Sequence, residues 1–152
     1  MSIATVKPHV VQNKFCPFSP GFQYDNRSAT DPIDYFKKLG IAFVSYSTLS
    51  GWPLHNSGAI SPKDDPHVAA IATRLHHTPT QVLLRWALQH GAAVIPTSRT
   101  HAADNAAVFD FELDEGDMAA ISGMSWFFEV PDRNIPQFAD VLAVQTAAGS
   151  DV

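Results

Sequence analysis

The chain has 152 residues, 45% hydrophobic and 16% charged, so it can form one domain with a real core and is too apolar for wholesale disorder. Ten basic and 15 acidic residues give a net charge of -5, which argues against general nucleic-acid binding. A single cysteine excludes an intrachain disulfide and a cysteine-only zinc site. Because no apolar run approaches the roughly 20 residues of a spanning helix, and the first residues lack the core of a secretory signal, we expect a soluble, cytoplasmic protein.

The first part of the chain predicts two strands and a helix. Residues 8–15 contain a short β-prone run, and the prolines and glycine of residues 16–21 break it. Asp31–Pro32 is typical of a helix cap followed by proline at the first helical position, and Gly40 of its end. Residues 41–47 are mostly apolar without alternation, which predicts a parallel strand buried on both faces.

The middle of the chain predicts a long loop and two helices. Residues 48–64 contain glycines and prolines and no sustained period, so they form the loop. Asp65–Pro66 repeats the cap-and-proline signal and opens the first helix. Residues 78–81 form a capping box that opens the second, which ends before Gly91 and places Val82, Leu83 and Trp86 in the core.

The last part predicts a third buried strand over residues 92–96, then a short helix through Ala107. Residues 108–113 predict a packing segment, and residues 114–121 a final helix. Residues 126–152 are expected to be a tail. The alternation of strands and helices predicts βαβ units and a parallel sheet. The outer strands of so small a sheet would offer unpaired backbone to another chain, so a homodimer through these edges is one expectation.

Four sequence blocks stand in an order that resembles the C-terminal half of the aldo-keto reductases. They are residues 7–12 (KPHVVQ), 40–49 (GIAFVSYSTL), 80–86 (TQVLLRW) and 94–113, which runs from VIPTS through Asp104 and Asn105 to FDFEL. The resemblance implies an α/β fold that is a partial TIM (β/α)8 barrel, with three parallel strands (family strands 6–8) and flanking helices. Residues 1–125 would form this half, and residues 126–152 would follow as the tail.

The resemblance further implies a nicotinamide cofactor, NADP with NAD as the alternative, lying across the carboxyl ends of the strands. Matching positions assign Gln12 to the nicotinamide amide and Tyr46 to stacking on its ring. Ser47 and Leu49 match positions that contact the pyrophosphate. The loop that opens the last barrel helix, where phosphate is favoured, is matched by Ser98, Arg99 and Thr100. Asp104 and Asn105 match the pair that contacts the adenine.

Two departures bear on the choice between NADPH and NADH. Thr97 stands where NADPH-preferring members often have lysine, and His101 lies near the usual place of an arginine. Arg99 could still supply charge to a ribose phosphate.

The family uses a tyrosine acid, a lysine, an aspartate and a histidine from the first half of its barrel, and no residue of this chain matches them. The resemblance therefore implies NAD(P)H-dependent reduction of an aldehyde or ketone to an alcohol, with this chain as the cofactor-binding half and the catalytic half missing. The alternatives are a catalytically silent half-barrel that binds cofactor or a partner, and a truncated product.

Two other candidate features have simpler interpretations. His76 and His77 have no third ligand at a suitable spacing, so we expect them to face solvent rather than a metal ion. Cys16 has no identifiable base partner, which favours an incidental loop thiol over a nucleophile.

Overall fold

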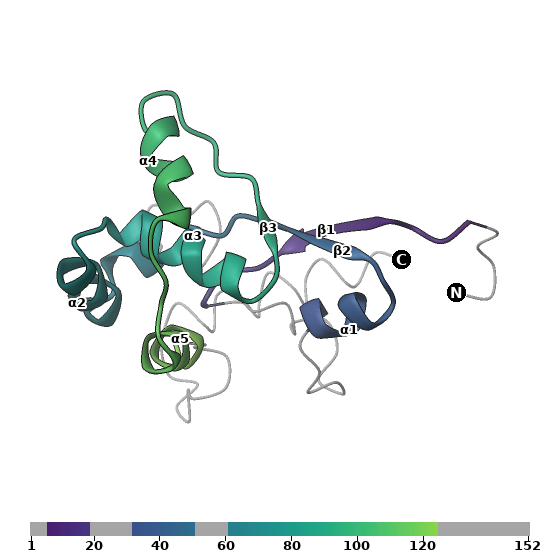
Figure 1. Ribbon diagram of the computed structural model, residues 1–152, viewed down its shortest axis with the longest axis horizontal. Helices are drawn as coiled ribbons and strands as arrows, with labels where there is room; N and C mark the ends of the chain where they lie inside the picture. The colour runs from purple at the N-terminus through teal and green to yellow at the C-terminus, as the bar shows by residue number, and fades with distance from the viewer. Residues whose placement is uncertain (1–5, 19–31, 51–60, 125–152) are drawn as a thin grey trace, which may run out of the picture.

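The computed structural model of the protein describes residues 6–18, 32–50 and 61–124 (Figure 1). The predicted cap at Asp31 and the predicted tail, residues 126–152, lie outside these ranges. The strands are β1 (Val10–Lys14), β2 (Ala42–Tyr46) and β3 (Ala93–Val94). The helices are α1 (Pro32–Lys38), α2 (Pro66–Leu75), α3 (Pro79–Gln89), α4 (Ala102–Ala106) and α5 (Glu115–Ser122), with 3-10 turns η1 (Pro62–Asp64) and η2 (Ala107–Phe109).

The three strands form one parallel sheet in the order β1-β2-β3. Gln12 of β1 is level with Val44 of β2, which in turn is level with Ala93 of β3. Because side chains alternate along a strand, residues at the same level share a face of the sheet. The parallel α/β arrangement predicted from the order of elements is therefore confirmed.

The core lies between the sheet and helix α3. Phe15, immediately after β1, and Phe43 of β2 are both buried in it. The predicted α3 core residues Val82, Leu83 and Trp86 are likewise buried, and the Trp86 ring stacks on Phe15 with 4.8 Å between centroids. Apolar residues at helical spacing thus cover one face of the sheet, as the pattern predicts.

The prediction that β2 is buried on both faces is wrong. Phe43 and Ser45 are buried, whereas Ala42 and Tyr46, which point to the other side, are exposed. The strand predicted at residues 92–96 shortens to β3, and Ile95 beyond it is also exposed. The apolar composition of these strands suits two covered faces, but the core of the described residues lies on one side only.

The helix starts follow local sequence signals. The Asp65 carboxylate accepts a hydrogen bond from the backbone N–H of His67 at 2.8 Å, which caps α2. The capping box predicted for residues 78–81 is present at the start of α3. The predicted loop over residues 48–64 ends earlier than expected, because Ser61 caps the turn η1 and Pro62 fits its first position.

Residues with positive φ angles follow three of the helices, and the sequence predicts the two glycines among them but not the histidine. Gly40 and Gly91 have φ angles of 65° and 95°, which favour glycine just past a helix. His76 takes the same role after α2 with φ 56°. His77 then stacks on Phe111 at 3.9 Å, so the expectation that both histidines face solvent is wrong for His77.

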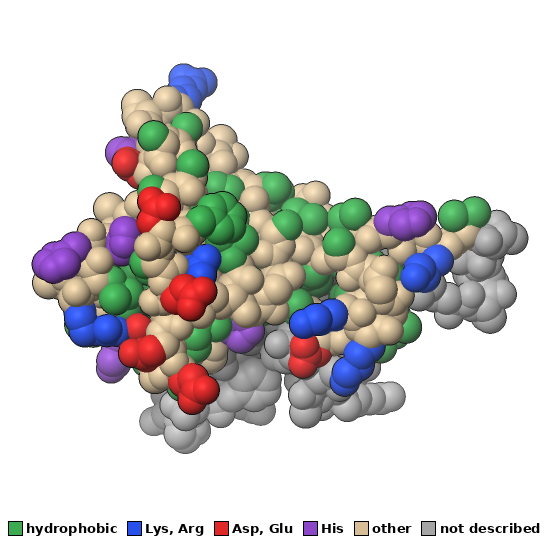
Figure 2. Space-filling model, viewed as in Figure 1, with side chains coloured by type: hydrophobic (Ala, Val, Ile, Leu, Met, Phe, Trp, Pro, Cys, Tyr) green, Lys and Arg blue, Asp and Glu red, His purple; other side chains and the backbone are tan. Residues whose placement is uncertain are grey.

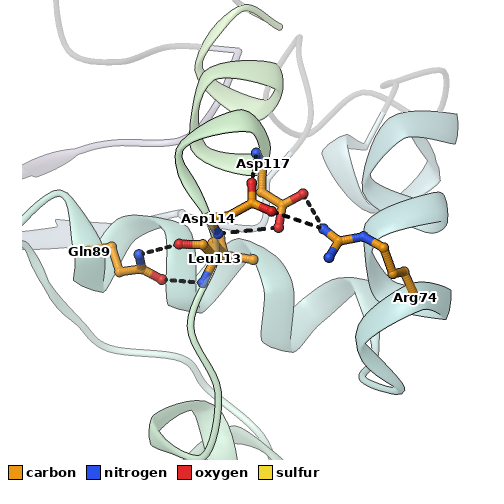
Figure 3. A network of polar contacts seen from close by, with 5 residues as sticks. All are labelled: Arg74, Gln89, Leu113, Asp114 and Asp117. Atoms are coloured by element: carbon orange, nitrogen blue, oxygen red, sulfur yellow. Dashed lines mark hydrogen bonds and ion pairs between the residues drawn. The ribbon is translucent and has the colours of Figure 1, made fainter.

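A polar network holds the last helix against α2 and α3 (Figure 3). The Asp117 carboxylate pairs with the guanidinium of Arg74 on α2. The Gln89 side chain at the end of α3 bonds both the N–H and the C=O of Leu113, at 2.8 and 2.9 Å. These contacts join residues far apart in the sequence, so they fix how the C-terminal described segment packs.

Cys16 is fully buried in the core, which corrects its interpretation as an incidental loop thiol. Its position after β1 places it beside the core aromatic Phe15, where a small apolar side chain fits. Within the described ranges, none of the helices could cross a membrane.

Candidate cofactor site

The carboxyl ends of the three strands lie along one edge of the sheet. β1 ends at Lys14, level with Tyr46 at the end of β2, and β3 ends at Val94. In parallel α/β folds ligands bind at this edge, because the connecting loops meet there. All nine predicted site residues lie near the end of a strand or in the segment that follows it: Gln12, Tyr46, Ser47, Leu49, Ser98, Arg99, Thr100, Asp104 and Asn105.

Gln12 and Tyr46 lie on the same face of adjacent strands. Gln12 is level with Val44, two residues before Tyr46, so both side chains project from the exposed side of the sheet. The Tyr46 side chain remains 39% exposed. An exposed aromatic ring and an exposed carboxamide on one face could contact a planar amide ligand together.

The turn after β2 is held by buried hydroxyl groups. The Ser45 hydroxyl donates to the carbonyl of Phe15 at 2.8 Å and lies 2.5 Å from the hydroxyl of Thr48. Ser47, between them, has φ 55°, which is unusual for a residue with a side chain. Such strain is found at turns that position functional groups. Sequence reasoning missed Ser45 and Thr48, whose interior hydroxyls were the available signal.

Ser47 and Leu49, two residues apart in this turn, have different surroundings. Ser47 is half-buried at the edge of the sheet, whereas the Leu49 side chain packs against the hydrophobic core. Leu49 therefore contributes its backbone rather than its side chain to the surface of this turn.

The segment after β3 carries five predicted residues. The hydroxyl oxygen of Ser98 accepts a hydrogen bond from the backbone N–H of His101 at 2.8 Å. Arg99 and Thr100 are exposed beside it. Sequence reasoning did not place His101 among the site residues, yet its ring nitrogen lies 3.2 Å from the Asp104 carboxylate.

Asp104 and Asn105 lie on the short helix α4. The backbone carbonyl of Asp104 accepts a hydrogen bond from the side chain of Gln81 on α3 at 3.0 Å, which ties α4 to the core. The side-chain oxygen of Asn105 is buried and has no hydrogen-bond partner within the described part of the chain. A buried acceptor without a donor is costly, and a bound amino group would satisfy it.

Lys14 is a charged group at this edge that sequence reasoning missed. It shares the sheet face of Gln12 and Tyr46 but is itself buried. Burial lowers the pKa of its ammonium group, and the charge of nearby Cys16 opposes that shift. The signal was a lysine at the end of an otherwise uncharged strand.

The described residues contain no group of three or more histidine, cysteine, aspartate or glutamate side chains that could hold a metal ion. The chemistry of this edge is therefore that of an aromatic ring, amides, hydroxyls, the His101–Asp104 pair and the cationic groups of Lys14 and Arg99.

Comparison with known proteins places these features in a family. The profile of the aldo/keto reductase family matches residues 1–125. The chain is 36% identical, over 126 residues, to a probable NAD(P)H-dependent D-xylose reductase of Aspergillus clavatus, covering 78% of this chain and 36% of that protein. It is 30% identical to the aldo-keto reductase family 1 member A1 of Gallus gallus, covering 86% of this chain and 39% of the relative.

Solved protein structures also superpose on this chain. A Bombyx mori aldo-keto reductase in complex with NADP superposes with a TM-score of 0.66 at 27% identity, over 82% of this chain and 39% of that one. A mutant of Gox0644 in complex with NADPH gives 0.63 at 31% identity, over 82% and 41%. The chain thus spans about two fifths of the proteins it matches, and its sheet is part of a TIM barrel. The chain belongs to the aldo/keto reductase family.

Proposed function

We propose that this chain forms the cofactor-binding part of an NAD(P)H-dependent reductase that converts an aldehyde or ketone to an alcohol. The observation that carries the proposal is the exposed pair Gln12 and Tyr46 on one face of the sheet. Residues 95–105 continue from the end of the third strand, β3, at the same edge. The matched relatives include reductases named as NAD(P)H-dependent. Their activity is extended to this chain as a proposal, because it spans only part of their length.

Gln12 and Tyr46 would bind the nicotinamide end of the cofactor. The Tyr46 ring offers a flat apolar surface for stacking, and the Gln12 carboxamide can both donate to and accept from the nicotinamide amide. When bound, NAD(P)H supplies the hydride that carbonyl reduction needs. The residues of this chain would determine which face of the ring is open to the substrate.

The segments after β2 and β3 would bind the rest of the cofactor. Ser47 and the backbone of Leu49 offer polar groups to the pyrophosphate, and Ser98, Arg99 and Thr100 offer hydroxyls and a positive charge to a phosphate. Asp104 and Asn105 would contact the adenine. The buried Asn105 oxygen fits this assignment, because an adenine amino group would supply the donor that it lacks.

NADP is the proposed cofactor and NAD the alternative. Arg99 is exposed beside Thr100 and can pair with a ribose phosphate, but Thr97 and His101 provide less fixed charge than lysine or arginine would. NADPH binding should therefore depend on salt more than NADH binding does.

The proton donor is proposed to lie outside this chain. Reduction of a carbonyl delivers a hydride to carbon and a proton to oxygen, and no residue here matches the family's tyrosine, lysine, aspartate and histidine. This chain by itself is accordingly expected to bind cofactor without turnover. We also propose a cytoplasmic location.

Titration of the purified chain with NADPH and NADH, followed by intrinsic fluorescence, tests the proposal. We expect saturable quenching, weakened about fivefold or more by Tyr46→Ala, since stacking on an aromatic ring contributes about 1–3 kcal/mol. Tyr35→Ala is the matched control, because Tyr35 is an exposed tyrosine on α1 rather than on the sheet. No saturation at millimolar cofactor, or equal binding by the Tyr46→Ala protein, would overturn the proposal.

A further inference from the structure

The loop between β3 and α4 carries a histidine that is not among the proposed cofactor contacts. His101 is exposed, and its backbone N–H donates to the Ser98 hydroxyl at 2.8 Å, so the loop closes on itself. This hydrogen bond places His101 beside the residues proposed to bind a phosphate, Ser98, Arg99 and Thr100. Figure 2 shows basic, histidine and acidic side chains at the surface over the region where Figure 1 places α4 and the loop before it.

The imidazole ring of His101 is oriented by an acidic neighbour. Its Nδ1 lies 3.2 Å from the Asp104 carboxylate, and the ring does not cap α4. An ionised carboxylate only accepts hydrogen bonds, so Nδ1 carries a hydrogen and donates it to Asp104. In the neutral ring the other nitrogen, Nε2, then has a lone pair and no hydrogen. Because 70% of the side chain is exposed, a ligand can reach this ring from solvent.

The charge of the His101 ring determines what it offers to a phosphate. Phosphate oxygens accept hydrogen bonds, as does the Nε2 of a neutral ring, so the two cannot bond to each other. Protonation adds a hydrogen to Nε2 together with a positive charge, and a charge-assisted hydrogen bond is about twice as strong as a neutral one. The protonated ring is therefore a phosphate-binding group and the neutral ring is not.

The fixed charges of the loop cancel while the ring is neutral. Arg99 contributes one positive charge and Asp104 one negative charge, and residues 95–109 contain no other lysine, arginine, aspartate or glutamate. A phosphate approaching the loop then meets attraction and repulsion together. Protonation of His101 makes the loop positive as a whole, which favours an anion.

The elements around α4 bring further charges. α4 packs chiefly against α3 and η2. The charged residue of α3, Arg85, pairs with Glu112 at 3.1 Å, and the exposed Asp110 follows η2. Among these types of side chain, histidine is the one that ordinarily changes charge between about pH 5 and 8. Changes in the charge of this loop over that range are therefore assigned to His101.

We infer that His101 is a specificity-determining residue that binds the additional phosphate of NADPH when its ring is protonated. Because NADH lacks that phosphate, the preference for NADPH over NADH should increase as the pH falls. The inference rests on the proposed function, which assigns this loop to the cofactor phosphate. A permanently charged side chain at this position would bind the phosphate equally well at neutral and acidic pH, whereas His101 binds it only in the acidic range.

The test measures NADPH and NADH binding by the full 152-residue chain at about pH 6 and about pH 8.5, using isothermal titration calorimetry. NADPH should bind about two- to fourfold more tightly at the lower pH, within the range of an exposed ion pair, and NADH equally at both. His101→Gln should remove this rise, because an amide stays neutral. Since the phosphate itself gains a proton near about pH 6, this variant should bind NADPH no better in acid.

Two further variants separate a role of His101 from a general effect of pH. His67→Gln is the matched control, because His67 on α2 is also exposed and its Nδ1 also lies 3.2 Å from a carboxylate, that of Asp65. It should keep the whole rise in NADPH affinity. His101→Arg should bind NADPH at about pH 8.5 at least as tightly as the unsubstituted chain does at about pH 6, because arginine stays charged.

A second measurement follows the His101 ring itself by NMR. Adenosine 2′,5′-bisphosphate, which carries the additional phosphate without the nicotinamide, should move the titration of this ring to higher pH, whereas adenosine 5′-monophosphate should not. The two effects are linked, because a ligand that prefers the protonated ring must also favour protonation. A residue with only a structural role would give the same titration with both nucleotides.

The outcomes distinguish this inference from the proposed function. NADPH affinity that is independent of pH, or that rises in acid equally in the His101→Gln chain, would overturn the inference and leave the proposed function standing. An equal rise for NADH would do the same, because NADH has no additional phosphate. Failure of both cofactors to bind at either pH would overturn the proposed function and this inference with it.

Discussion

The ring of Trp86 on α3 lies nearly parallel to the ring of Phe15 after β1, at 9° and 4.8 Å between centroids. The indole N–H also donates to the hydroxyl of Ser122 on α5 at 3.0 Å. One side chain thus joins the first strand, the central helix and the last described helix.

Trp86→Ala should therefore lower the free energy of unfolding by about 3–5 kcal/mol, because it leaves a large cavity and removes the hydrogen bond to Ser122. Urea-induced unfolding followed by circular dichroism measures the change. Phe109→Ala is the control and should change the free energy by no more than about 0.5 kcal/mol, since its ring is exposed. Similar effects of the two substitutions would contradict the packing described here.

The Asp117 carboxylate should contribute more to the free energy of unfolding than an exposed carboxylate in a comparable ion pair does. It caps the start of α5 and pairs with Arg74, and its side chain is buried. Asp117→Ala should lower the free energy of unfolding by about 1–2 kcal/mol through its lost hydrogen bonds. Glu112→Ala, which removes the exposed partner of Arg85, should have no measurable effect on urea unfolding. Equal losses would show that α5 docks without this network.

Local sequence signals predict where helices begin, but not the contacts between residues that are far apart in the chain. Helix starts at Asp65 and Thr78 were predictable, because capping involves residues two or three apart. The burial of Cys16 and the packing of Leu49 depend on neighbours distant in sequence, so no local pattern specifies them. For the cofactor site, the order of the blocks placed the segments, but it missed the Ser45 hydroxyl that holds the turn after β2.

The burial of β2 differs from what its sequence predicts. Its apolar residues predicted cover on both faces, and the structure covers the Phe43 side alone. The composition of the strand fits a complete barrel, while the packing reflects the part of a barrel present in this chain. The exposed Ala42 and Tyr46 are where the composition of the strand and its packing disagree.

The buried Lys14 predicts a specific pH dependence of stability. Burial lowers the pKa of its ammonium in the folded state below the ordinary value of 10.5, so folding is opposed while the group is charged. Relative to the unsubstituted chain, Lys14→Met should therefore gain free energy of unfolding at neutral pH compared with pH near 10.5. The gain should shrink as pH rises through the folded pKa toward 10.5, because the unfolded state then binds more protons than the folded state.

Urea unfolding of both proteins across this pH range measures the difference. Lys38→Met, at the exposed end of α1, is the control and should show no comparable trend. A constant difference between the Lys14→Met protein and the unsubstituted chain at all pH values would contradict the argument from burial.

Arg99 should determine part of the preference for NADPH. Arg99→Ala should weaken NADPH binding several-fold and leave NADH binding nearly unchanged, because only NADPH carries the additional phosphate. The difference should fall as salt is raised, since Arg99 is exposed. Fluorescence titrations at low and high salt measure it, with Lys63→Ala on η1 as the control. Equal weakening of both cofactors would place Arg99 away from that phosphate.

The most direct test of the central claim is an NMR titration of the isotope-labelled chain with NADPH. Backbone amide shifts should change at Gln12, Tyr46 and Ser47 and in residues 98–105, all at or after the strand ends. Amides of α5 (Glu115–Ser122), which packs on α2 away from this edge, should stay constant. Shift changes confined to the strand-end residues would support a cofactor-binding half-barrel. No change at millimolar NADPH, or changes centred on α5, would contradict it.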